Sequence, residues 1–310
     1  MNWQKKIEKL KAEKNAVILA HYYQDPAIQD IADFIGDSLA LSYESAKSSA
    51  DIIVFAGVAF MAETAKILAP NKKVLLPDPE AGCSLADHCT EAAFSKFVAN
   101  HPDHLVITYI NCSADIKAMS DIICTSSNAL GIVNSLPPEQ KIIFAPDKNL
   151  GNYINIKTGR DMLLWDGSCF IHETFSAKKI LELKKEHPEA KILAHPECAH
   201  IVIEIADHIG STNSIINYAV QDKETDTYII VTESGILHQM QKLIPDKKLI
   251  PAPPEFYTSC NCGECPYMKM NTLEKLYNCL YMETPEISLK EDTRAKAEKA
   301  LKKMFDLSNV

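Results

Sequence analysis

Three segments of the chain repeat one pattern, and this repeat limits the folds that the chain can adopt. Each copy begins with a short apolar run that ends in a polar ring, at residues 17–21, 105–109 and 191–195. The ring residues are His21, Tyr109 and His195, and successive rings are 88 and 86 residues apart. Self-similarity at a regular spacing indicates repeated supersecondary units that pack against one another.

The three copies continue to match without gaps after the ring residue. Polar residues follow two positions later, aspartates twelve, isoleucines fourteen and hydroxyls seventeen positions later. These sets are Tyr23, Asn111 and Glu197; Asp33, Asp121 and Asp207; Ile35, Ile123 and Ile209; and Ser38, Ser126 and Thr212. We predict that the three hydroxyls are N-caps of helices at 38–48, 126–136 and 212–220.

Further apolar runs alternate with helical segments in each copy, which is typical of parallel strands in α/β layers. They lie at 52–55, 142–145 and 228–231, and then at 74–76, 162–164 and 249–250. We therefore predict an α/β fold of three homologous three-layer αβα domains, each a βαβαβ unit, arranged around a pseudo-threefold axis. The predicted divisions are 1–88 (with an N-terminal helix), 89–175, 176–270 and a C-terminal helical segment, 271–310.

Charge and hydropathy exclude several classes of partner. The net charge is −9 and no basic stripe occurs, so neither nucleic acid nor an anionic membrane surface is expected as a partner. No apolar stretch is long enough for a membrane span. Residues 1–15 are rich in Lys and Glu, so we expect no signal peptide and a cytoplasmic protein. The glycines never form a nucleotide-binding loop.

The polar strand ends predict the position of a ligand site. In open α/β sheets, ligands bind beyond the carboxyl ends of the strands. His21 and Tyr23, Tyr109 and Asn111, and His195 and Glu197 occupy those ends, and a hydroxyl-bearing helix start follows each pair. Around a threefold axis the three edges face one cavity, where helix N-termini favour carboxylates or phosphate.

The chain has ten cysteines, and in a protein of this class metal binding or catalysis is a better explanation for them than disulfides. Each copy reaches cysteine after its third apolar run: Cys83, Cys169, and a group formed by Cys260, Cys262 and Cys265. Three thiolates with one open metal position suit catalysis. Spacing alone does not choose between zinc and an iron–sulfur cluster, nor among the three cysteines of the last copy.

Several motifs together resemble the iron–sulfur (type A) quinolinate synthases, and the resemblance extends through most of the chain. They are HYYQ at 21–24, DIADFIGDS at 30–38, FMAETAKIL at 60–68, YIN at 109–111, PDKNL at 146–150, HPEC at 195–198, GST at 210–212 and CPYMKMN at 265–271.

This resemblance implies an activity and a cofactor. The family condenses iminoaspartate (2-iminosuccinate) with dihydroxyacetone phosphate to quinolinate, phosphate and water in de novo NAD biosynthesis. It uses one 4Fe–4S cluster with one open iron, which three cysteines hold. Cys83 and Cys169 match two ligands. Cys265 is favoured as the third because it opens the CPYMKMN motif, which leaves Cys260 and Cys262 as extra thiols.

The resemblance also implies roles for individual residues. The expected catalytic residues are Glu197 as a base, His195 and Tyr23 as proton shuttles, and His21 and Tyr109. The expected substrate-binding residues are His21, Ser38, Tyr109, Asn111, Ser126, His195, Glu197, Ser211 and Thr212. Asn217 departs from the family, because many members carry Lys there; Lys148 or Arg160 would then supply the lost phosphate contact. L-Aspartate oxidase or dehydrogenase is the transient partner expected to supply iminoaspartate.

Two other functions fit the residues. One is a different cluster-dependent hydro-lyase that acts on a small polyanion. The other is a non-catalytic repeat scaffold stabilised by zinc, although a scaffold has no need of polar residues at the strand ends. Iron or zinc content after anaerobic purification distinguishes the scaffold from the two enzymes.

Overall fold

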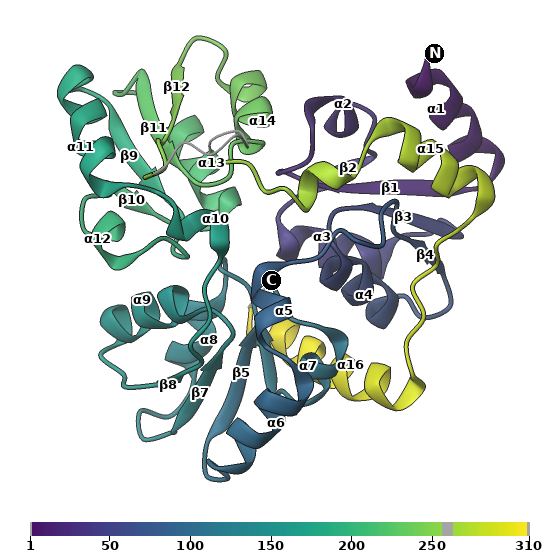
Figure 1. Ribbon diagram of the computed structural model, residues 1–310, viewed down its shortest axis with the longest axis horizontal. Helices are drawn as coiled ribbons and strands as arrows, with labels where there is room; N and C mark the ends of the chain where they lie inside the picture. The colour runs from purple at the N-terminus through teal and green to yellow at the C-terminus, as the bar shows by residue number, and fades with distance from the viewer. Residues whose placement is uncertain (1, 256–262, 309–310) are drawn as a thin grey trace.

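Buried apolar runs form the central strands of three separate parallel sheets. The computed structural model describes residues 2–255 and 263–308. Figure 1 shows three lobes around a common centre, each with one four-stranded sheet and helices against it. Strands β3, β7 and β11 are buried along their whole length. The predicted α/β class and the three αβα units around a pseudo-threefold axis are confirmed.

The first unit has strand order β2-β1-β3-β4, so β1 lies inside the sheet with a neighbour on each side. Its elements are α1 (Trp3–Glu13), β1 (Ala16–His21), α2 (Pro26–Gln29), β2 (Phe34–Gly36), α3 (Ser38–Lys47), β3 (Ile52–Ala56), α4 (Ala59–Leu68) and β4 (Lys73–Leu75).

The second unit repeats this order as β6-β5-β7-β8. Its elements are α5 (Ser84–His88), α6 (Glu91–Ala99), β5 (Leu105–Tyr109), α7 (Ala114–Ala118), β6 (Ile122–Cys124), α8 (Ala129–Ser135), β7 (Ile142–Ala145), α9 (Lys148–Thr158) and β8 (Leu163–Leu164).

The third unit repeats the order again as β10-β9-β11-β12. Its elements are α10 (Phe170–Glu173), α11 (Ala177–Glu186), β9 (Lys191–Ala194), α12 (His200–Ile203), β10 (His208–Ile209), α13 (Thr212–Gln221), β11 (Thr227–Val231), α14 (Ile236–Leu243) and β12 (Lys248–Pro251).

The predicted count of three strands per unit was wrong, because each sheet has a fourth. The additional strands β2, β6 and β10 are only two or three residues long and pair with one neighbour each. They contain the repeated Ile35, Ile123 and Ile209. A strand this short leaves too few residues for a periodic pattern to indicate it.

The repeated aspartates hold these edge strands in register. Asp33 accepts a hydrogen bond from the Ile18 N–H at 2.7 Å, and the Asp33 N–H donates to the Ile18 carbonyl at 2.9 Å. Asp121 makes the same pair of bonds with Val106, and Asp207 makes it with Ile192. This part of the repeat is therefore structural, since each carboxylate completes the ladder beside the first strand.

The predicted helix caps were wrong by one or more residues. The N-caps of α3 and α13 are Asp37 and Ser211, whose side chains accept from the Ala40 and Ser214 N–H groups. The N-cap of α8 is Asn128. Ser38 and Thr212 therefore lie in the first helical turn, and Ser126 lies in the turn before α8, so none of their hydroxyls is needed as a cap.

The two C-terminal helices pack against different units. After the 3₁₀ turn η1 (Met268–Met270), helix α15 (Leu273–Met282) packs on α1 and β3 of the first unit. Helix α16 (Glu291–Leu307) packs on α7 and β6 of the second unit and also contacts α4. The predicted domain limits stay a prediction. Within the described ranges, no helix combines the length and apolar character that crossing a membrane requires.

Candidate active site

One cavity of about 800 Å³, its open mouth included, lies where residues of all three units meet. The cavity brings together almost all of the predicted site residues: His21, Tyr23, Ser38, Cys83, Tyr109, Asn111, Ser126, Cys169, His195, Glu197, Thr212 and Cys265. Residues at the carboxyl ends of β1, β5 and β9 all line this cavity, which is where ligands bind in parallel sheets.

His21 and His195 occupy equivalent positions and have the same proton arrangement. The backbone N–H of Tyr23 donates to His21 Nδ1 at 3.2 Å, and that of Glu197 donates to His195 Nδ1 at 3.4 Å. Each ring therefore carries its proton on Nε2. His195 Nε2 is 3.2 Å from the Ser126 hydroxyl. Burial lowers the pKa of both histidines to about 3, so both are neutral hydrogen-bond donors.

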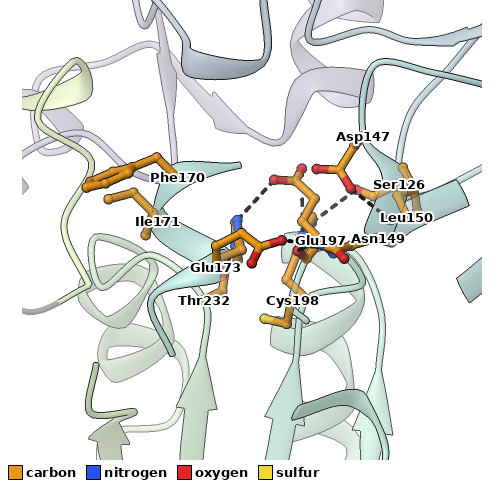
Figure 2. Close-up of polar contacts among 12 residues, drawn as sticks. Ser126, Asp147, Asn149, Leu150, Phe170, Ile171, Glu173, Glu197, Cys198 and Thr232 are labelled. Atoms are coloured by element: carbon orange, nitrogen blue, oxygen red, sulfur yellow. Dashed lines mark hydrogen bonds and ion pairs between the residues drawn. The ribbon is translucent and has the colours of Figure 1, made fainter. Parts of the chain in front are cut away.

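Glu197 is a buried carboxylate surrounded by polar groups (Figure 2). The Tyr109 hydroxyl donates to Oε1 at 2.5 Å, and His172 Nδ1 lies 3.0 Å from Oε2. Burial raises the pKa of Glu197, but His172 and the hydrogen bond from the Tyr109 hydroxyl lower it, and the result lies below the usual range. The carboxylate is therefore ionised at neutral pH and able to accept a proton.

A second chain of hydrogen bonds leads from Tyr23 to the same carboxylate. The Tyr23 hydroxyl is 3.0 Å from Thr212 Oγ1 and 2.7 Å from Thr232 Oγ1. Thr232 Oγ1 is 2.9 Å from His172 Nε2. Because His172 also faces Glu197, the network links the first unit to the third through groups that can exchange protons.

The three cysteines lie at the starts of short helical turns. Cys83 and Cys169 are the N-caps of α5 and α10, and Cys265 lies just before η1. Burial raises the pKa of Cys83 to about 12 and that of Cys265 to about 11, and it raises that of Cys169 well above its usual range. Nearby backbone N–H groups lower these pKa values. They belong to Leu85 and Ala86 for Cys83, to His172 for Cys169, and to Tyr267 and Met268 for Cys265.

Three partly buried thiols that line one cavity fit a metal cluster. Hydrogen bonds to sulfur and burial are the features that tune thiolate-ligated iron. A cation is also the group that makes buried thiolates stable. Cys260 and Cys262, expected to be extra thiols, lie outside the described residues.

The side chains predicted to bind substrate offer both donors and acceptors. Among the described residues, Asn111 Oδ1 has no hydrogen-bond partner although it is buried. A buried polar atom without a partner is costly, so a bound ligand is its natural partner. Ser211 does not line the cavity; its hydroxyl caps α13 instead.

The residues considered for the phosphate contact lie elsewhere. Lys148 pairs with Asp166 at 2.9 Å, and the Arg160 guanidinium donates to the Leu136 carbonyl at 2.6 Å. Asn217 is exposed on α13. None of these three residues lines the cavity, and no lysine or arginine of the described chain does.

Sequence reasoning missed His172, Asp147 and Glu233, all of which are buried around the cavity. His172 follows Cys169 by three residues, which is a signal for one helical turn, but it lies outside the gapless repeat. Asp147 and Glu233 follow the strands β7 and β11, and only the sheet register reveals their equivalence.

Comparison with known proteins identifies the family. A family model described as "NadA: Quinolinate synthetase A protein" matches residues 5–306. This chain belongs to the quinolinate synthetase A family. The chain is 62% identical over 302 residues to the quinolinate synthase of Thermosynechococcus vestitus, covering 97% of this chain and 94% of that protein. Identity and coverage are the same for the quinolinate synthase of Microcystis aeruginosa. The quinolinate synthase of Chloroherpeton thalassium is 60% identical, covering 97% and 93% of the two chains.

Membership in the quinolinate synthetase A family confirms the resemblance that the motifs indicated. It also makes the chain an enzyme and not a repeat scaffold. The polar network that joins three units around one cavity agrees with this conclusion, since a scaffold needs no buried ionised carboxylate there.

Proposed function

We propose that this chain synthesises quinolinate from iminoaspartate and dihydroxyacetone phosphate, with release of phosphate and water, in NAD biosynthesis. The observation that carries the proposal is the convergence of one cysteine from each repeat with His21, His195 and Glu197 on a single cavity. Family membership supports it.

Cys83, Cys169 and Cys265 are the proposed ligands of a 4Fe–4S cluster. Three cysteines leave one iron without a protein ligand, and when bound this open iron supplies a Lewis acid that polarises a substrate oxygen or nitrogen. The placement of all three partly buried thiols in the lining of one cavity supports this assignment.

Neutral donors are proposed to hold the dicarboxylate substrate. The Nε2–H groups of His21 and His195, the hydroxyls of Ser38, Ser126 and Thr212, and Asn111 line the cavity. Donors of this kind bind carboxylates without a glycine-rich loop. Because no lysine or arginine in the described chain lines the cavity, hydroxyl and N–H groups are also proposed to bind phosphate.

Glu197 is the proposed general base. It is ionised at neutral pH; the Tyr109 hydroxyl donates to its Oε1, and His172 Nδ1 lies 3.0 Å from its Oε2. A base within hydrogen-bond reach of the substrate removes a proton during imine rearrangement and dehydration. Tyr23 is the proposed proton donor, since burial keeps its hydroxyl protonated and Thr232 and His172 connect it to Glu197.

Anaerobic purification followed by iron and sulfide quantitation and an activity assay tests the proposal. We expect about four iron and four sulfide per chain, a broad absorption band near 400 nm, and turnover of iminoaspartate with dihydroxyacetone phosphate to quinolinate. A fully loaded cluster without quinolinate formation would favour the hydro-lyase that acts on another small polyanion.

A single zinc ion is the second candidate for the metal. Ligand atoms of Cys169, His172 and Glu197 all lie within 4.8 Å of one another, and three mixed ligands with an open position are typical of catalytic zinc. About one equivalent of zinc, without iron, in an air-stable colourless protein would support this candidate and contradict the cluster.

The setting of the reaction is also proposed. We infer that iminoaspartate comes from an L-aspartate oxidase or dehydrogenase acting as a transient partner, and that the chain works in the cytoplasm. The family resemblance supports the first inference, and the Lys- and Glu-rich composition of residues 1–15 supports the second.

A further inference from the structure

Glu233 is a buried carboxylate that the proposed mechanism does not use. It follows β11, lines the cavity, and has a side chain that is only 1% exposed. Its two oxygens accept two backbone N–H groups: Oε1 accepts from Cys265 at 3.1 Å, and Oε2 accepts from Gly235 at 2.7 Å. A carboxyl group this deeply buried needs such partners, and here one partner is a proposed iron ligand.

We propose that Glu233 is a positioning residue that fixes Cys265 at the cluster site through the Cys265 backbone N–H. The inference rests on the proposed function, because it takes Cys265 to be a ligand. Groups that orient the first ligands of a metal commonly change its affinity by about 10- to 100-fold when they are altered. Glu233 acts on the ligand and not on the substrate.

Lys269 completes the arrangement and joins it to the first unit. Its Nζ lies 3.5 Å from Glu233 Oε1, donates to the Tyr23 carbonyl at 3.0 Å, and lies 3.4 Å from Asp25 Oδ1. The ammonium group therefore compensates the buried charge of Glu233. It also links the Cys265 turn to the loop after β1.

The sheet register gives a second, independent observation. Strand β9 pairs Leu193 with Ile230 of β11, and strand β5 pairs the equivalent Ile107 with Phe144 of β7. Glu233 lies three residues after Ile230, and Asp147 lies three residues after Phe144. The two buried carboxyl groups therefore occupy the same position in successive repeats.

The equivalent Asp147 is also buried, but its contact differs. Its Oδ1 accepts the Leu150 N–H at 2.8 Å at the start of α9, and burial raises its pKa well above the usual range. In the first unit the equivalent position, three residues after Phe55, is the apolar Val58. The repeat therefore places a buried carboxyl group at this position in two units, and the hydrogen bond to a cysteine N–H is the one between Glu233 and Cys265.

Glu233→Gln tests the inference with little change in volume. Glutamine has one side-chain oxygen, so it cannot accept from both Cys265 and Gly235. We expect the anaerobically loaded variant to release iron to an excess of chelator about 10- to 100-fold faster than wild type, followed as loss of the absorption near 400 nm. The spectrum of the reduced cluster in electron paramagnetic resonance should also change.

Glu63→Gln is the matched control. Glu63 is a half-buried glutamate outside the cavity lining, and its Oε2 accepts the Ala114 N–H at 2.8 Å across two units. Iron release from this variant should equal that from wild type. Equal acceleration in both variants would mean that general loss of stability releases the iron, and would overturn the inference.

Lys269→Met separates the N–H contact from the link between units. It keeps the acceptor for Cys265, so iron release should stay within about threefold of wild type, well below the effect expected for Glu233→Gln. Release as fast as from Glu233→Gln would overturn the inference even if that variant folds poorly. If wild type binds iron and Glu233→Gln releases it at the same rate, the inference about Glu233 is overturned, but the proposed cluster is not. If wild type binds no iron, the proposed cluster is overturned as well.

Discussion

His21 and His195 occupy the same position in two copies of the repeat, and both present an Nε2–H donor to the cavity. In both, a backbone N–H two residues later occupies Nδ1 and leaves the Nε2 proton for the cavity. Tyr109 holds the equivalent position in the second unit and donates to Glu197 instead. The site is therefore built from equivalent positions, but its chemistry is not threefold.

The buried histidines predict a sensitivity to acid in the metal-free protein. Their pKa is about 3 in the folded chain and about 6.5 when exposed, so the neutral form is favoured by folding. Their contribution is complete above pH 6.5 and is lost as pH falls toward 3, at about 1.4 kcal/mol per pH unit for each histidine. Urea unfolding of His195→Gln should show a shallower loss between pH 6.5 and 4.5 than wild type; equal slopes would contradict a neutral buried His195.

Glu197→Gln should keep the cluster and lose most of the rate. The amide preserves the shape but cannot accept a proton, so kcat should fall by about 100-fold or more. Iron content measured in the same samples is the control. Undiminished turnover would remove Glu197 from the mechanism.

Cys265→Ser should lose iron and the absorption near 400 nm, since serine does not replace a buried thiolate ligand. Cys262→Ser is the matched variant from the same segment, and it should retain both. The choice between them came from the CPYMKMN motif, and Cys262 lies outside the described residues. Loss of absorption in Cys262→Ser alone would mean that Cys262 is the ligand.

At the residue level, the sequence predicted the strand-end groups better than the groups that support them. His21, Tyr109 and His195 end recognisable apolar runs, so their positions followed from the repeat. His172 and Glu233 act through contacts with residues distant in the sequence, such as Glu197 and Cys265, which no local pattern encodes. The misplaced caps have a similar cause, because Asp37 and Ser211 precede the repeated hydroxyls by one residue and compete for the same role.

Among the elements, the short edge strands depend on a single side chain each. Strand β6 has three residues. Asp121, which directly precedes it, accepts a hydrogen bond from the Val106 N–H of β5. The sequence revealed the conserved spacing of these aspartates within the repeat but not their purpose. A ligand role and a structural role give the same spacing, and only the strand pairing distinguishes them.

Asp121→Ala should lower the free energy of unfolding by about 0.5–1.5 kcal/mol, because the Val106 N–H loses its acceptor. Asp161→Ala, at an exposed aspartate, is the control and should change it by no more than about 0.5 kcal/mol. Denaturant unfolding of both metal-free variants measures the difference. Equal effects would mean that Asp121 does not support β6.

Across the whole molecule, the last helix connects two units. Leu301 and Met304 of α16 are completely buried, and the helix contacts both α7 and α4. The sequence predicted a C-terminal helical segment over 271–310, and α16 lies within it. Which sheet it covers depends on the path of the chain after α15, and this path has no signature in the sequence.

Leu301→Ala should destabilise the protein by about 2–5 kcal/mol through loss of buried area and the cavity left behind. Lys302→Ala, the next residue on the exposed side of the same helix, should have little effect. Thermal and denaturant unfolding report the stability, and iron content reports whether the site remains assembled. A small effect of Leu301→Ala would mean that α16 is not part of the cooperative core.

The distribution of the cysteines over three units has a consequence for synthesis. Cys83 and Cys265 are 182 residues apart, and the second and third units lie between them. At about 5–20 residues per second, a ribosome needs roughly 9–36 s to pass from the first thiol to the last. A nascent chain therefore exposes incomplete sets of thiols for most of its translation. If these three thiols hold the proposed cluster, iron delivery must follow synthesis of most of the chain, so that loading acts on a nearly finished polypeptide and not a growing one.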